Sequence, residues 1–573
     1  MCLETRTTVF WANCTFNWGI VTNGGLTIGG LAFLDEPLAA ANVSAVLSKA
    51  AVGIQCPFGS FAPHGGWHEG SMYWQYVAEY AVATTEALRS SYGDDHGLSD
   101  APGFNETALF RLYMNGPSQN SFDFGDSDGD LSNSAAGYFM GYSALPSSNR
   151  HMRALCAYEG RRLAKLIGGY FDANVTTGPD SHTGAAAPIK YNCGGRSPHL
   201  DVEGAKAYSS SSTAAAAVAA AADDLLPTTD GGDVIDCSRL LIDYSPAGTA
   251  ADIQALPTAR LFKLSAFGWQ GRNAIGFFRS AWSTEAEGAS GKHSYLAFKA
   301  ANGVPNHNDL DGGTFVFEAG GQRWGMDLSA DDYQLKNYFT QSLEYRYGYY
   351  RKSTAGHNTL TFDNDGIDNS NRGACDQDPG MTGRTEITLF EGSDTDRPAA
   401  AAASASRSSP AYSIVDLTAA YSPQNSSRVE RGFAFTESYE HLLIVDEFEF
   451  AAGSSVNNVT WSMHTMASIK LNAGTGSSSV GGSAAVLSLG GATLHARVVE
   501  PKGASFSTAE VNLLPPFRAS AGVSKLMVAL PITLGGSGGA TRIVVGLSLS
   551  SVAAAVTPNS LAQWGASGPF AGE

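Results

Sequence analysis

The stretch NHNDLDGGTFVFEAGGQRWGMDL, residues 306–328, contains the pattern of a β-hairpin. Two short runs of β-forming residues, 313–318 and 323–328, lie on either side of Gly320-Gly321. Paired glycines take the positive φ angles that a tight hairpin turn requires. The sequence therefore predicts two adjacent antiparallel strands in this part of the chain.

Polar residues that suit a metal site lie before and after this turn. If the segment before the turn is a strand, alternation places His307, Asp309 and Asp311 on one face. An imidazole and two carboxylates are ligands that divalent metals accept. With a two-residue turn, Asp311 and Asp327 would lie on opposite faces, so a metal bound by both requires a bulge or break at Gly312-Gly313. The alternative is a polar hairpin whose acids cap loops and face water.

Further β-rich runs surround the hairpin, separated by segments rich in glycine, serine and alanine. Short alternating runs between such turn-forming segments are typical of antiparallel sheets. They predict a many-stranded antiparallel β domain over residues 235–573. The runs are 274–282, 294–299, 359–362, 386–390, 413–417, 429–436, 441–450, 459–464, 493–499, 525–531 and 541–547.

The chain before this β domain is mostly helical by pattern. Residues 43–52, 72–89 and 131–167 carry apolar side chains at helical intervals. We expect a helical domain over residues 1–171 and a low-complexity insertion or linker over residues 172–234. Helices followed by strands, without alternation, predict an α+β chain with two segregated domains.

Composition and charge exclude several classes of protein. The 573 residues carry a formal net charge of −18 and form no basic stripe, which argues against a nucleic-acid partner. The seven cysteines include no CxxC pair, and their odd number leaves at least one thiol unpaired within the chain. No apolar run is long enough to span a membrane, and residues 1–11 do not form a signal peptide.

A second polar motif, PHGGWHEGSMYWQY, occupies residues 63–76. Glycines that open a helix beside His64, His68, Glu69 and Tyr73 suit a sugar-binding cleft, and the N-terminus of a helix offers backbone N–H groups to an anion. The alternative is an ordinary loop whose aromatic side chains pack on the next helix.

These motifs together resemble the heparinase II/III-like family of polysaccharide lyases. The resemblance rests on residues 306–328, on YYRKSTAGHNTL at residues 349–360, on Phe16-Asn-Trp-Gly19 and on the glycine-rich motif at residues 65–74. It implies a helical (α/α) toroid, apparently truncated because its Asn-Trp segment begins near residue 17, followed by a large antiparallel β-sandwich. It also implies a secreted or extracytoplasmic protein that cleaves uronate-containing polysaccharides by elimination.

The resemblance implies roles for individual residues. Tyr73 corresponds to the tyrosine that shuttles the proton, and Asn17 to the residue that neutralises the uronate carboxylate. A tyrosine base needs cationic neighbours, because its ordinary pKa is near 10. His307 is the neighbour expected to take part in catalysis. The residues expected to contact substrate are Trp18, Trp67, His68, Glu69 and Arg351.

A zinc ion with a structural role is the cofactor that the resemblance implies. Asp327 and His357 correspond to zinc ligands, and either Asp309 or Asp311 to a further ligand. The expected partner is an anionic polysaccharide, whereas the sequence leaves the oligomeric state open.

Two positions depart from the family pattern. Trp18 stands where the family often has a histidine, and Asp309 stands in place of a second histidine, where its charge would repel a uronate. One alternative is therefore a catalytically impaired, glycan-binding relative. A third hypothesis is a glycoside hydrolase that uses Glu69 and Asp126 as its paired carboxylates.

Overall fold

The computed structural model describes sixteen segments of the chain, which form two compact units. One unit combines residues 1–131 with residues 250–573, and the other is residues 132–249. In the second unit, β1 (Lys190–Tyr191) pairs in parallel with β2 (Val234–Ile235). The helix expected over residues 131–167 lies outside the described residues. These residues are 16–37, 40–118, 120–127, 190–191, 234–235, 256–264, 273–282, 293–300, 307–363, 376–378, 385–392, 410–436, 439–473, 481–532, 541–550 and 557–570.

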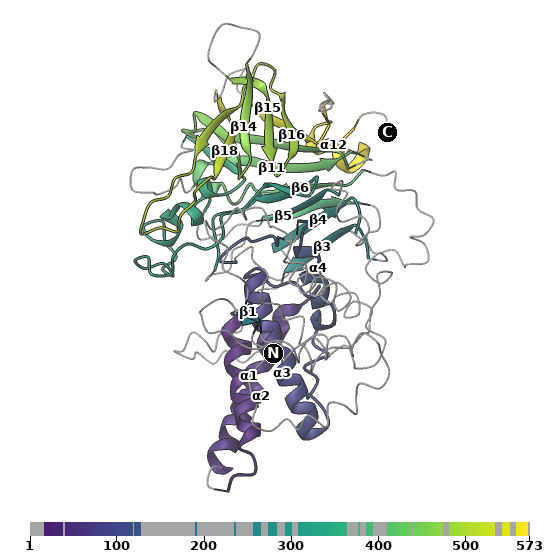
Figure 1. Ribbon diagram of the computed structural model, residues 1–573, viewed down its shortest axis with the longest axis vertical. Helices are drawn as coiled ribbons and strands as arrows, with labels where there is room; N and C mark the ends of the chain where they lie inside the picture. The colour runs from purple at the N-terminus through teal and green to yellow at the C-terminus, as the bar shows by residue number, and fades with distance from the viewer. Residues whose placement is uncertain are drawn as a thin grey trace, which may run out of the picture. The chain divides into compact units, whose positions relative to one another are not determined.

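The N-terminal part of the larger unit is helical, as the sequence predicts. Its helices are α1 (Asn17–Ala32), α2 (Ala40–Phe58), α3 (Ser71–Tyr92) and α4 (Thr107–Met114), and Figure 1 draws them in purple and blue. Glycine lets α1 approach α3 closely, because a Cβ atom on Gly24 would lie 2.6 Å from Thr84 Oγ1. A closed toroid stays a prediction. Among the described residues, no helix is both long and apolar enough to cross a membrane.

Among the described residues, the rest of the larger unit contains three antiparallel sheets and one α-helix. One sheet has the strand order β3-β4-β5-β6-β7, with β3 (Ala259–Leu264), β4 (Asn273–Arg279), β5 (Tyr295–Lys299), β6 (Phe315–Ala319) and β7 (Gln322–Gly325). The largest sheet has the order β14-β15-β16-β19-β12-β11-β10-β9. Its strands are β14 (Ser468–Ala473), β15 (Gly481–Leu489), β16 (Ala492–Glu500), β19 (Arg542–Ser548), β12 (His441–Phe450), β11 (Ser426–Phe435), β10 (Tyr412–Asp416) and β9 (Glu386–Glu391). The third has the order β17-β18-β13-β8, with β17 (Ser507–Glu510), β18 (Ser524–Pro531), β13 (Asn458–Thr465) and β8 (Leu360–Phe362). Helix α12 (Leu561–Ser567) packs on β11, where Leu561 and Trp564 approach Gly432.

One hydrophobic core joins the three sheets. The ring of Phe433 in β11 lies 4.6 Å from that of Phe298 in β5 and 5.8 Å from that of Phe315 in β6, measured between centroids. Phe315 also packs near Trp461 in β13. Because all four side chains are buried in this core, the sheets stack on one another as the sequence predicts for the C-terminal part.

The predicted hairpin at residues 306–328 is confirmed at its turn and wrong in its first segment. Ala319 pairs with Gln322, and Gly320 and Gly321 both have positive φ. However, residues 307–314 form no strand: β6 starts at Phe315, and a turn at Gly312-Gly313 precedes it. The chain thus breaks from the strand pattern at the glycine pair where a metal shared by Asp311 and Asp327 would require it.

An arginine connects the helical part to the β3–β7 sheet. Arg279 in β4 donates hydrogen bonds to the carbonyl oxygens of Leu112 and Tyr113, at 3.2 and 3.3 Å, near the C-terminus of α4. Cations are favoured at this end of a helix because its last carbonyl groups have no partner within the helix. The Tyr295 hydroxyl donates to the Tyr113 carbonyl oxygen as well, at 2.8 Å. The helices and the β3–β7 sheet thus meet through buried polar contacts.

Candidate active site and metal centre

Two of the predicted catalytic residues are in direct contact. Tyr73 lies in the first turn of α3, and its ring stacks on that of His307, with centroids 3.7 Å apart and planes 20° from parallel. Gly70, the residue before the helix, has φ +92°, and a Cβ atom there would lie 2.2 Å from Ser127 Oγ. Only glycine fits this position, which explains the Glu-Gly-Ser sequence just before Tyr73. The Tyr73 hydroxyl is 2.5 Å from that of Tyr333.

A buried aspartate orients the imidazole of His307. Asp126 Oδ2 lies 2.7 Å from His307 Nδ1, and Tyr338 donates a hydrogen bond to Asp126 Oδ1 at 2.6 Å. Arg346 and Lys352 each place a nitrogen 3.0 Å from Oδ1. Burial alone would raise the pKa of Asp126, but these two cations and His307 hold it well below its usual range. Asp126 is therefore an ionised carboxylate and cannot be the proton donor that a hydrolase requires.

Asn17 is held by residues expected to contact substrate. Its backbone N–H and its Nδ2 group donate to the two carboxylate oxygens of Glu69, at 2.8 and 3.1 Å. Trp67 Nε1 donates to the same carboxylate at 3.0 Å, and the Trp67 ring stacks on His68. Because Trp67, His68 and Glu69 are all buried, they form the framework behind Asn17. Trp18, by contrast, has 46% of its surface exposed.

The tyrosine at the centre of the site is a protonated phenol at neutral pH. Burial raises the pKa of Tyr73 well above its ordinary value, and the carboxylates of Asp126 and Glu69 raise it further. The hydrogen bond to Tyr333 acts in the opposite direction but does not cancel these effects. In the free protein Tyr73 is therefore suited to donate a proton.

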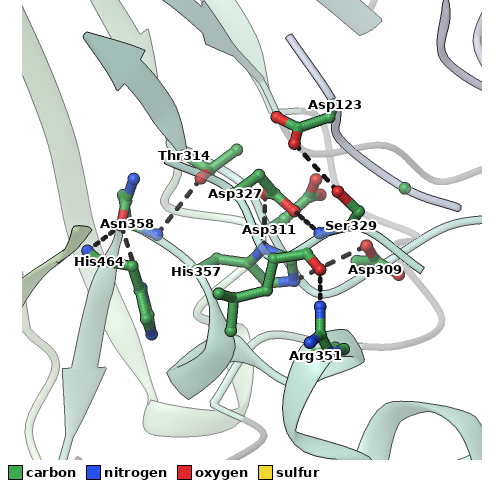
Figure 2. Close-up of polar contacts among 12 residues, drawn as sticks. Asp123, Asp309, Asp311, Thr314, Asp327, Ser329, Arg351, His357, Asn358 and His464 are labelled. Atoms are coloured by element: carbon green, nitrogen blue, oxygen red, sulfur yellow. Dashed lines mark hydrogen bonds and ion pairs between the residues drawn. The ribbon is translucent and has the colours of Figure 1, made fainter. Parts of the chain in front are cut away.

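A second cluster lies deeper in the β domain (Figure 2). Asp309, Asp311 and His357 each offer a ligand atom within 4.8 Å of the other two, and all three are buried. Asp311 Oδ1 and His357 Nε2 have no hydrogen-bond partner. Buried polar atoms are rarely left this way, so these residues fit a divalent ion.

Asp327 approaches the other side of the same imidazole. Its Oδ2 atom lies 3.1 Å from His357 Nδ1, while its Oδ1 atom accepts the backbone N–H of Ser329 at 2.9 Å. A carboxylate on Nδ1 fixes the orientation of the ring, so that Nε2 would point at an ion held by Asp309 and Asp311. Asp327, predicted to be a ligand, lies outside the set of three close ligand atoms and orients the imidazole of His357; its role as a ligand stays a prediction.

Basic residues balance the acids of the cluster. Lys299 Nζ lies 2.7 Å from Asp311 Oδ2, out of line for a hydrogen bond. Asp309 is fully buried, with Lys352 Nζ at 3.1 Å and an Arg346 nitrogen at 3.3 Å. The expectation that Asp309 would repel a uronate is therefore wrong, because its charge is neutralised away from any open surface.

Arg351, predicted to contact substrate, is engaged inside the protein. It has 5% of its surface exposed, and its guanidinium donates to the carbonyl oxygens of Leu328, Arg518 and Ala519. Its neighbour Lys352 instead reaches the two carboxylates described above. The basic run before His357 thus supplies charge to the site, but through a different residue from the one expected.

Comparisons with known proteins agree with this fold. Residues 258–540 match the protein family described as "Heparinase II/III-like, C-terminal". A crystal structure of heparinase III aligns with 94% of this chain at 10% sequence identity, with a TM-score of 0.53. A structure titled "Heparinase III-BT4657 gene product" aligns with 92% of it at 12% identity, with a TM-score of 0.50. The chain spans 62% and 58% of these two proteins, and identities this low show the fold alone. No curated protein sequence matches the chain.

Proposed function

We propose that this chain, which belongs to the heparinase II/III-like family through its domain at residues 258–540, is a polysaccharide lyase that cleaves a uronate-containing polysaccharide by β-elimination. The observation that carries the proposal is the stack of the protonated Tyr73 phenol on a His307 oriented by Asp126. This pair unites a proton donor and a proton acceptor at one point, which elimination requires.

Elimination removes the C5 proton of the uronate, breaks the bond from C4 to the glycosidic oxygen and leaves a C4–C5 double bond. With Nδ1 of His307 bound to Asp126, its Nε2 atom accepts the C5 proton. The Tyr73 phenol donates its proton to the departing oxygen. Loss of a proton from the imidazolium to water and uptake of one by the phenolate then restore both groups.

The C5 proton becomes more acidic when the adjacent carboxylate is neutralised, because the developing enediolate is then stabilised. The Asn17 amide has two N–H bonds, and one donates to Glu69. The second is the donor that we assign to the uronate carboxylate; because Asn17 is 1% exposed, the substrate must displace the side chains that cover it. Exposed Trp18, at the next position, offers an apolar ring to the sugar.

Asp309, Asp311 and His357 would hold the metal ion, which we propose to be zinc. When bound, this ion would cross-link the segment before β6 to the segment before β8, adding directly to folding stability. His357 is positioned for that role by Asp327, whatever ion is present. Cys56 is disulfide-bonded, which supports a secreted or extracytoplasmic location because disulfides persist in oxidising compartments.

Digestion of a panel of uronate polymers, followed by ultraviolet absorbance, tests the proposal. We expect absorbance to rise with at least one polymer, because the product carries a conjugated double bond. Tyr73→Phe should abolish the rise, whereas Tyr76→Phe, on the same helix but 43% exposed, should leave it intact. New reducing ends without absorbance would refute elimination and indicate a hydrolase.

A non-catalytic glycan-binding relative is the second candidate. The exposed Trp18, at a position where the family often has a histidine, favours it. Retardation of the folded protein in a polysaccharide gel, with no product of either kind, would support this candidate over the lyase.

A further inference from the structure

We propose that Phe339 and Tyr333 form an aromatic platform that binds a sugar ring of the polysaccharide beside the residue being cleaved. This inference rests on the proposed function for the identity of its ligand. Both side chains are unusually accessible for large rings, with 47% of Phe339 and 38% of Tyr333 exposed. We call these two residues the platform.

The platform is continuous with the Tyr73–His307 pair. The Phe339 ring meets the His307 ring edge-on, with centroids 5.9 Å apart and planes at 90°. The rings of Phe339 and Tyr333 lie 5.0 Å apart, and the Tyr333 hydroxyl contacts that of Tyr73. A ligand on the platform therefore lies next to the groups that would carry out the elimination.

The loop that carries the platform is firmly anchored. Tyr338, between the two exposed residues in sequence, is buried, and its hydroxyl donates to Asp126. Its ring contacts both platform rings, at 5.1 Å from Tyr333 and 5.2 Å from Phe339. Leu335 and Tyr349 complete a small core with Tyr338 beneath the loop. The exposure of the platform is thus imposed by packing and leaves both rings facing solvent.

The chemistry of the platform fits a sugar ring. Pyranose rings present C–H groups on their faces, which pack on aromatic rings, as apolar groups generally do. Phe339 has no polar atom and no proton to transfer, so its contribution to the site is apolar contact alone. The negative charge of the ligand is then recognised elsewhere, by the Asn17 amide. Stacking of this kind on one exposed ring corresponds to an affinity change of about 10-fold.

Affinity electrophoresis in gels containing each polymer of the uronate panel tests the platform directly. The binding measurements use the Tyr73→Phe background, so that no polymer is consumed. We expect Phe339→Ala to weaken retardation about 10-fold and Phe339→Trp, which keeps a large ring, to restore it. Phe33→Ala removes a phenylalanine that is 58% exposed at the end of α1 and should change nothing. Unfolding temperatures of all variants confirm that the fold is retained.

Steady-state kinetics provide a second test of the platform. In the catalytic background, the loss in kcat/KM of Phe339→Ala should fall mainly on KM. Wild-type retardation and KM in Phe339→Ala would overturn the platform while leaving the lyase intact, as would an equal loss in Phe33→Ala. Absence of any unsaturated product would refute the lyase, but the gels would still decide whether Phe339 binds the polymer. Absence of retardation in every gel would overturn the platform as well.

Discussion

Replacing Lys352 with methionine should destabilise the protein strongly and alter its affinity for metal ions. The Lys352 ammonium is completely buried, 3.0 Å from Asp126 Oδ1 and 3.1 Å from Asp309 Oδ2, and it donates to the Gly125 carbonyl oxygen at 2.8 Å. Methionine keeps the volume and the apolar stem but removes the charge. Two buried carboxylates then lose a shared cation.

The size of the effect follows from these contacts. Removing one partner from a buried ion pair costs about 3–5 kcal/mol, because the remaining charge is left uncompensated. Arg346 still contacts both carboxylates, which keeps the expected cost near the lower end of that range. Since the shift per kcal/mol falls as a unit grows, to about 1–2 °C for one larger than 250 residues, the unfolding temperature should fall by about 5 °C.

Calorimetry of the metal-free protein, with and without added zinc, measures both consequences. Lys352 competes with an ion for the charge of Asp309, so Lys352→Met should bind zinc more tightly than the wild type and recover part of its lost stability on adding it. Lys49→Met removes an exposed lysine from α2 and should leave the unfolding temperature within about 1 °C. A fall of the same size in both variants, or no differential response to zinc, would refute the reasoning.

Two further predictions concern pH. Burial raises the pKa of Tyr73 above its ordinary value, so the phenol keeps its proton at high pH. If Tyr73 is the proton donor, kcat should not fall between pH 9 and about 10.5. A rate that climbs with pH across that range would show that the phenolate is the base. Burial raises the pKa of Asp376 to about 7, so the folded protein binds a proton that the unfolded chain has lost, and stability declines as pH rises from about 4 to 7. In Asp376→Asn the amide oxygen can still accept the Phe362 backbone N–H. In denaturant titrations, the stability of this variant relative to wild type should increase by up to about 4 kcal/mol between pH 4 and pH 8. Parallel pH profiles of the two proteins would contradict this assignment.

The hairpin was predictable because its signals are local. A glycine pair between two β-rich runs determines the turn whatever surrounds it, and the structure has the turn at Gly320-Gly321. The segment before the turn was mispredicted because alternation of polar residues does not show how far the neighbouring strand extends. In the structure, the strand pairing of β5 with β6 begins at Phe315. Gly313 and Thr314 still form backbone hydrogen bonds with Lys299, but the residues before them follow no strand of this sheet.

The residue that orients His307 could not be predicted from the sequence. Asp126 lies 181 positions before His307, in a polar segment with no periodicity to mark one acid among several. Arg346, Arg351 and Lys352 lie close together in the sequence, which gives no reason to prefer two of them over the third. Their partners distinguish them: Arg351 donates to main-chain carbonyl oxygens, whereas Arg346 and Lys352 contact carboxylates.

The aspartate at position 309 shows why a departure from a family pattern needs its neighbours to be interpreted. Taken alone, a carboxylate in place of an imidazole suggests a site unable to accept an anionic sugar. In the structure, the cations that neutralise Asp309, namely Lys352 and Arg346, also contact Asp126, which holds His307. The substituted position is thus part of the network that orients the imidazole, and its charge helps to retain the two cations there. Asp309 therefore indicates a site whose buried interior is rearranged. Trp18 is then the only one of the two departures that lies on the accessible side of the site.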